Sequence, residues 1–162
     1  MYRHVTWIGC LLVLGCESTP PPSPSAGTAS PSQSSAVPGK WADHTQGLPF
    51  LVGYDEGRRA SESQNRPAMM FVTTTWCGWC KKLADDDFND PEIRKLLQQF
   101  VCVIVDGDTE QQAVRQLDAT EGFPTIVFLS PAGDRLGGCL GYKGPREFKD
   151  LLQNALGRAQ GS

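Results

Sequence analysis

Two cysteines, Cys77 and Cys80, stand three positions apart in the stretch TTTWCGWCKK at residues 73–82. This spacing fits a metal clamp, a structural disulfide, or a redox pair that opens and closes. On a helix it brings the two Cα atoms to about 5 Å, which a disulfide accepts. A helix that starts at Cys77 favours a thiolate there, because unpaired N–H groups make a helix start partly positive. The thiolate is the attacking species in thiol–disulfide exchange.

Metal and haem sites are the first alternatives. A structural zinc ion needs four ligands, but both histidines, His4 and His44, lie before the predicted core, and Cys102 and Cys139 stand alone on strands. Covalent haem attachment requires a histidine where Lys81 stands. A copper carrier stays open, although no His or Met companion lies beside the pair. We therefore expect no metal and no organic cofactor.

A structural disulfide is the main remaining alternative. Closing a loop of four residues removes little chain entropy from the unfolded state, so it stabilises a fold poorly. Redox chemistry makes better use of the spacing, with Cys77 as the nucleophile and Cys80, one turn further, as the shielded resolving thiol. We expect these two cysteines to be the catalytic residues.

The pair must be positioned by the strands and helices around it. Apolar runs predict strands at 48–52, 68–72, 100–105, 125–129 and 135–140. Helices are predicted at 54–65, from Cys77, from Asp90-Pro91-Glu92, from a Thr109/Gln112 capping box, and from Gly144-Pro145. This alternation predicts an α/β fold: a mixed central sheet flanked by helices, with a C-terminal β-hairpin and helix.

The segments Trp76-Cys-Gly-Trp-Cys80-Lys81 and Gly122-Phe-Pro-Thr125 resemble the thioredoxin superfamily, over nearly all of residues 48–157. The resemblance implies a thioredoxin fold, a cis bond before Pro124, and contact between Pro124 and the cysteine pair. It also implies that the backbone of Phe123 pairs with a substrate peptide. Small exported bacterial thiol:disulfide interchange proteins carry similar motifs.

One position departs from the thioredoxin pattern. Thioredoxins carry a buried Asp six residues before the first cysteine, and Phe71 stands there in this chain. Proton transfer at Cys80 is then expected to be slower, or to use water or an acid such as Asp106 or Asp108. Those two acids also fit ordinary loop positions at a strand end.

Aromatic residues around the pair are candidate substrate contacts, and we assign Trp76, Gly78, Trp79, Phe123 and Pro124 to this group. An indole between the two cysteines cannot be buried beneath so short a bridge, so Trp79 should be partly exposed. It would either shield the disulfide or contact an apolar partner chain.

Several other residues carry simpler expectations. The lysines after the pair should form a solvated helix face balanced by Asp85 to Asp87. Cys102 should be a buried small apolar residue, whereas Cys139 is expected on an accessible edge strand, with no bridge between them. Trp41 either covers a sheet edge or anchors the preceding segment.

The first 39 residues have a different composition. A cationic start and a short apolar run predict a signal peptide at 1–15, and Val13-Leu14-Gly15-Cys16 resembles the lipobox of bacterial lipoproteins. The resemblance implies that Cys16 receives lipid; an ordinary signal peptide is the alternative. Residues 16–39 are rich in Pro and Ser and predict a disordered tether before a domain at 40–160.

These features together predict a monomeric thiol:disulfide oxidoreductase, held by lipid on a membrane of the bacterial cell envelope and facing the periplasm. Its partners would be protein thiols or disulfides and a membrane electron-transfer protein. A net charge of −3 without a basic stripe gives no indication of nucleic-acid binding. The reducing direction is favoured because no histidine stands near Cys77 in the sequence. A non-catalytic docking lipoprotein with a structural disulfide is the alternative.

Overall fold

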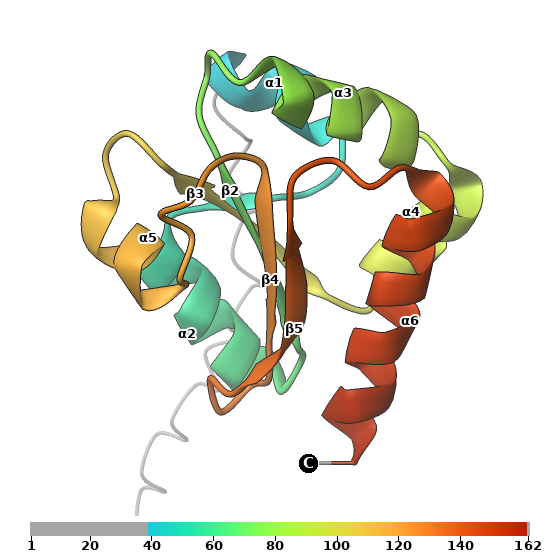
Figure 1. Ribbon diagram of the computed structural model, residues 1–162. Helices are drawn as coiled ribbons and strands as arrows, with labels where there is room; N and C mark the ends of the chain where they lie inside the picture. Colours follow the sequence, from blue (N-terminus) through green and yellow to red (C-terminus); the bar gives the residue numbers. More distant parts are fainter. Residues whose placement is uncertain (1–38, 162) are drawn as a thin grey trace, which may run out of the picture. The chain divides into compact units, whose positions relative to one another are not determined.

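The computed structural model describes residues 39–161 (Figure 1), so the predictions for the signal, Cys16 and the tether lie outside the described residues. Five strands form one mixed sheet in the order β1-β3-β2-β4-β5. They are β1 (Leu51–Val52), β2 (Ala68–Thr73), β3 (Val101–Asp106), β4 (Thr125–Leu129) and β5 (Arg135–Leu140). β1 and β2 run parallel to β3, β4 runs antiparallel to β2, and β5 antiparallel to β4. The predicted sheet with an antiparallel hairpin is confirmed.

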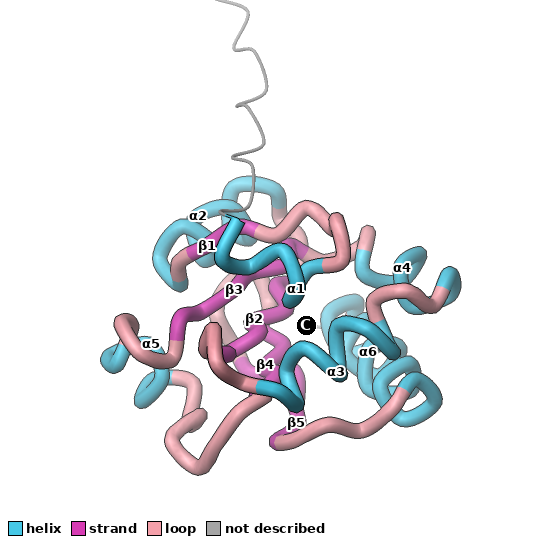
Figure 2. Tube along the Cα trace, turned by 90° about the horizontal axis from the view of Figure 1, so that it is seen from above, coloured by secondary structure: helices cyan, strands magenta, loops and turns pink. Residues whose placement is uncertain are grey.

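Helices cover both faces of this sheet (Figures 1 and 2). The helical elements are η1 (Gly39–Trp41), α1 (Ala42–Thr45), α2 (Tyr54–Gln64), α3 (Gly78–Asp87), α4 (Pro91–Leu97), α5 (Gln111–Gln116) and α6 (Pro145–Gln160). α3, α4 and α6 pack on one face, and α2 and α5 on the other. Within residues 39–161, no helix combines the length and apolar character that crossing a membrane requires.

β2 lies in the centre of the sheet, and its side chains alternate between two cores. Met69 and Phe71 face α3, α4 and α6, while Met70 and Val72 face the opposite side, and all four are fully buried. A strand that is covered on both faces needs apolar residues at every position, which is why this segment reads as a continuous apolar run. β2 ends just before the cysteine pair and thereby positions it.

Local cap residues set the helix starts. Cys77 is the N-cap of α3, and Asp90 is the N-cap of α4, where its carboxylate accepts the N–H groups of Glu92 and Ile93. The predicted capping box from Thr109 to Gln112 is wrong. The N-cap of α5 is Glu110, which makes no side-chain cap bond. Its carboxylate instead accepts the backbone N–H groups at 54 and 106, because it lies between α2 and β3.

The short α1 helix, which continues η1, lies against α3 (Figure 2). Trp41 is fully buried in the core beneath η1 and α1, and its ring meets the ring of His44 edge-on at 5.3 Å. Trp41 therefore anchors η1 and α1 to the core, while the segment that it was expected to anchor lies outside the described residues.

Candidate active site

The cysteine pair lies where the loop after β2 becomes α3. Cys77 and Cys80 form a disulfide with a Cα–Cα distance of 5.3 Å. Cys77 is 5 % exposed and Cys80 is fully buried, so Cys77 is the less shielded residue of the pair. The Cys77 Sγ accepts the backbone N–H of Cys80 at 3.1 Å. A helix-start N–H directed at this sulfur would stabilise a thiolate on it.

Phe123 and Pro124 lie in the loop before β4, and the bond between them is cis, as the resemblance implies. The Pro124 carbonyl accepts the N–H of Gly141, which fastens this loop to the end of β5. A cavity of about 310 Å³ opens here, lined by Trp79, Phe123, Pro124, Gly141 and Tyr142. The structure thus brings a residue between the cysteines together with the residues of the cis-proline loop.

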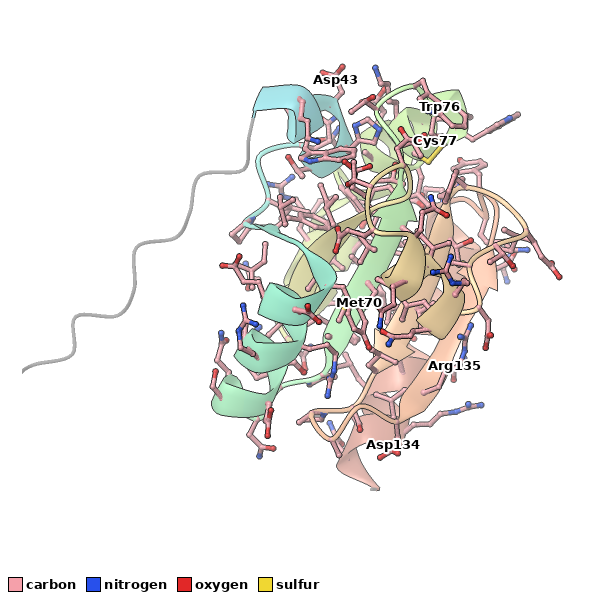
Figure 3. All side chains as sticks on the ribbon, turned by 90° about the vertical axis from the view of Figure 1, so that its left-hand side faces the viewer. Asp43, Met70, Trp76, Cys77, Asp134 and Arg135 are labelled. Carbon is pink, nitrogen blue, oxygen red and sulfur yellow. A yellow bond between two sulfur atoms is a disulfide. The ribbon has the colours of Figure 1, made fainter. Side chains whose placement is uncertain are left out.

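Two exposed indoles flank the disulfide. Trp76 is 69 % exposed and Trp79 is 61 % exposed, as expected for the latter. Trp76, labelled beside Cys77 in Figure 3, donates its indole N–H to the carboxylate of Asp108 and meets the Phe123 ring edge-on at 6.2 Å. Trp79 stacks on Tyr142 with 6.0 Å between ring centroids. Each indole is therefore held by a partner and still presents an apolar surface to solvent.

Two glycines near the pair differ in what they do. Gly78 is exposed at the first turn of α3, and a Cβ there would meet nothing within 4 Å. Neighbouring atoms therefore do not require glycine at position 78. At Gly107, which no motif of the sequence marks, a Cβ would lie 2.5 Å from the Phe123 ring. Only glycine at 107 leaves room for that ring.

The acids proposed as substitutes for the missing thioredoxin aspartate are already engaged. Phe71 is fully buried at that position and meets the Phe88 ring edge-on. Asp106 accepts the Lys40 ammonium at 2.9 Å; burial alone would raise its pKa, but this bond and the N–H of Asp108 lower it. Asp108 accepts the indole N–H of Trp76. Both acids thus have hydrogen-bond partners at this end of the sheet, as expected for loop acids at a strand end.

Asp87 corrects the expectation of a solvated acidic face. It is fully buried, and neither carboxylate oxygen has a hydrogen-bond partner among residues 39–161. Burial, and then the charges of Asp86 and Asp90, raise its pKa to about 7. Asp87 shares the buried face of α3 with Cys80 and lies two turns beyond it.

His44 corrects the expectation that no histidine stands near Cys77. Its ring is fully buried, and Nε2 lies 3.1 Å from the Thr74 carbonyl oxygen. The same carbonyl accepts the backbone N–H of Cys77 at 3.1 Å. Burial lowers the pKa of His44, so the ring is neutral near pH 7. Thirty residues separate the histidine from the carbonyl, and no local pattern connects them.

The remaining cysteines in residues 39–161 are free thiols. Burial raises the pKa of Cys102 to about 12 and that of Cys139 to about 11. β2 and β4 separate their strands, in agreement with the expected absence of a bridge. Within the same range, no three His, Cys, Asp or Glu side chains cluster in a way that could hold a metal ion.

The sequence profile of the thioredoxin-like family matches residues 49–131. This chain belongs to that family. The thioredoxin-like chain is 28 % identical over 107 residues to the thiol:disulfide interchange protein DsbD of Tatumella citrea, covering 62 % of this chain and 18 % of that protein. It is 30 % identical over 79 residues to mouse spermatogenesis-associated protein 20, covering 44 % and 10 %. The chain thus spans less than a fifth of the length of these relatives.

Solved structures show the same fold. A thioredoxin from Thermus thermophilus superimposes with a TM-score of 0.61 at 26 % identity, covering 68 % of this chain and 89 % of that one. The C-terminal domain of Neisseria meningitidis DsbD in the oxidised form gives 0.53 at 17 % identity, covering 65 % and 98 %. The thioredoxin fold implied by the sequence resemblance is confirmed.

Proposed function

We propose that this thioredoxin-like protein is a thiol–disulfide oxidoreductase that reduces disulfides in protein substrates. The observation that carries the proposal is the Cys77–Cys80 disulfide at the start of α3, in which Cys77 is slightly exposed and Cys80 is fully buried. An inert staple has no need of this asymmetry, whereas exchange chemistry requires one accessible and one shielded sulfur. Similarity to thiol:disulfide interchange proteins supports the same reaction class.

In the proposed reaction, the reduced protein attacks a substrate disulfide. The Cys77 thiolate forms a bond to one substrate sulfur, and the substrate S–S bond breaks to release the first substrate thiolate, which takes up a proton. Cys80 then loses its proton and attacks the Cys77 sulfur, which releases the second substrate thiol and restores the Cys77–Cys80 disulfide. Two electrons pass to the substrate, and a partner protein dithiol returns them to the pair.

The surface around the disulfide suits an extended chain with apolar side chains. Trp76 and Trp79 offer exposed indoles on either side, and the cavity beside Phe123 and Pro124 has room for a side chain. Aromatic surfaces of this kind contribute most of the binding energy in many protein contacts. We assign substrate contact to these four residues and to the first turn of α3 at Gly78.

The reducing direction is supported by the charges near the pair. The His44 ring is neutral near pH 7 and faces a carbonyl rather than the sulfur, so it adds no full positive charge. Lys81 is paired with Asp43 at 3.4 Å. A thiolate that is only moderately stabilised leaves the reduced form a better electron donor.

We also propose that Cys16 carries lipid and that residues 16–39 tether a monomeric domain to a membrane in the periplasm. The lipobox-like sequence and the Pro/Ser-rich composition support this location. The Cys16→Ala variant should leave the membrane fraction and appear in the soluble periplasmic fraction. If the variant and the wild type partition equally, the anchor lies elsewhere or does not exist.

The test of the reaction uses the full chain equilibrated with glutathione buffers. A reduction potential near that of thioredoxin, about −270 mV, is expected, together with reduction of a protein disulfide that Cys77→Ser abolishes. Cys80→Ser should retain substrates as mixed disulfides on Cys77. A pair that never equilibrates, or function that survives Cys77→Ser, would establish the docking lipoprotein instead.

A further inference from the structure

The segment from Lys40 to Gln46, the N-terminal brace, contacts both sides of the active-site turn. Lys40 pairs at 2.9 Å with Asp106 at the end of β3, and Asp108 in the loop that follows holds the Trp76 indole. On the α3 side, Asp43 pairs with Lys81 at 3.4 Å, and Gln46 donates to Asp85 at 2.5 Å. Figure 3 shows Asp43 and Cys77 at the same end of the described domain. The brace therefore contacts both α3, which carries the disulfide, and the end of β3.

His44 occupies the centre of the brace and has one polar contact in the described residues. A carbonyl oxygen only accepts, so the contact with Thr74 places the ring proton on Nε2. Nδ1 then carries no proton, and it has no hydrogen-bond partner in the described domain. The ring meets Trp41 edge-on and lies 6.4 Å from the Phe71 ring. Apolar surroundings and a single acceptor hold His44 in this neutral form.

We propose that His44 is a positioning residue for the nucleophile Cys77, acting through the carbonyl of Thr74. This inference rests on the proposed oxidoreductase function. The Thr74 oxygen receives the His44 Nε2–H on one side and the Cys77 N–H on the other, both at 3.1 Å. His44 therefore fixes the peptide plane that orients Cys77.

That orientation sets the reactivity of Cys77. As the N-cap of α3, Cys77 places its sulfur where the N–H of Cys80 reaches it at 3.1 Å. If the Thr74 carbonyl loses the imidazole donor, the turn has one fewer bond and the sulfur leaves this position more often. The thiolate loses stabilisation in proportion, so the pKa of Cys77 rises and its reaction rate near neutral pH falls.

The test compares three substitutions in the full chain. His44→Phe keeps an aromatic ring and removes the donor, whereas His44→Gln places an amide N–H₂ at similar reach. Gln46→Ala is the matched control, because it removes an exposed contact of the same brace with α3 and leaves every charge in the brace in place. The readout is the pH profile of Cys77 alkylation by iodoacetamide in the reduced protein, quantified by mass spectrometry of the peptide that contains Cys77.

His44→Phe should raise the Cys77 pKa and lower the alkylation rate at pH 6 about fivefold, the effect of one net hydrogen bond. His44→Gln and Gln46→Ala should stay within about twofold of the wild type. Equal rates in His44→Phe and wild type, or an equal loss in all three variants, overturn the positioning role. If His44→Phe does not fold, His44→Asn replaces it, because the shorter asparagine amide cannot reach the Thr74 carbonyl. Equal alkylation rates in His44→Asn and His44→Gln would then overturn the inference.

The outcomes separate this inference from the proposed function. A wild-type pair that does not exchange with glutathione removes the oxidoreductase function, whatever the His44 variants do. A wild type that exchanges normally, beside a His44→Phe variant with unchanged alkylation, removes only the positioning role.

Discussion

Asp87→Asn should stabilise the folded protein in a strongly pH-dependent way. The carboxylate is fully buried on α3 with no hydrogen-bond partner for either oxygen in the described domain, and its pKa is raised from 3.8 to about 7. Burial is the largest cause, followed by the charges of Asp86 and Asp90. Asparagine has nearly the same shape but no charge, so the substitution removes the titration and changes the packing little.

The sign follows from proton binding in the two states. Between pH 3.8 and 7 the folded protein holds the Asp87 proton and the unfolded chain has lost it. The free energy of unfolding of the wild type therefore falls by up to about 1.4 kcal/mol per pH unit in this window. The destabilisation is absent below about pH 4 and complete above pH 7, where the shift corresponds to about 4 kcal/mol.

Urea unfolding of the oxidised protein at several pH values from 4 to 8 measures this difference. The free-energy gap between Asp87→Asn and wild type should be near zero at pH 4 and grow to about 4 kcal/mol at pH 8. Asp85→Asn, an exposed acid two residues earlier, is the control and should differ from wild type by an amount that stays constant from pH 5 to 8. A gap for Asp87→Asn that does not change with pH would refute the reasoning.

Two further predictions concern the substrate surface. Gly107→Ala places a Cβ 2.5 Å from the Phe123 ring, so this ring must move. The KM for a protein disulfide should rise at least fivefold, while the turnover of a small disulfide changes little. Equal KM values for the variant and the wild type would contradict the steric argument. Tyr142→Phe keeps the stack on Trp79 and loses the hydrogen bond to Asp86, whereas Tyr142→Ala loses both contacts. Only the alanine variant should therefore weaken substrate binding, by about 1 kcal/mol in a titration with the oxidised substrate. Equal affinities of the two variants would show that the stack does not contribute to binding.

The features of this structure that could be predicted are those that depend on residues close together in the sequence. Asp90-Pro91-Glu92 marks the start of α4 because an N-cap acid and a proline act within one turn. The continuous apolar run of β2 indicates a central strand because both of its faces are covered. Helix geometry likewise predicts that Cys77 and Cys80 lie close enough for a disulfide, and the family resemblance implies the cis Phe123–Pro124 bond.

The parts that were missed depend on contacts between distant segments. His44 meets Thr74 thirty residues later, and no pattern in either segment points to the other. The burial of Asp87 was missed because it ends a run of three aspartates, which is typical of a solvated surface. It follows Cys80 by seven residues, however, and so shares the same face of α3. That periodicity was the one signal that could have identified it, and the run of three aspartates outweighed it.

His44 and Asp87 bear on the same question, the direction of electron flow. A strongly oxidising pair needs positive charge that stabilises the reduced thiolate. The buried histidine is neutral near pH 7, and the nearest lysine in sequence is paired with Asp43. Asp87 lies about 10 Å along α3 from Cys80, since seven residues rise 1.5 Å each. Above pH 7 its negative charge disfavours a thiolate on Cys77, ten residues or about 15 Å away, by about 1 kcal/mol at an effective dielectric constant near 20. Neither residue stabilises the thiolate by charge, in agreement with the reducing direction that we propose.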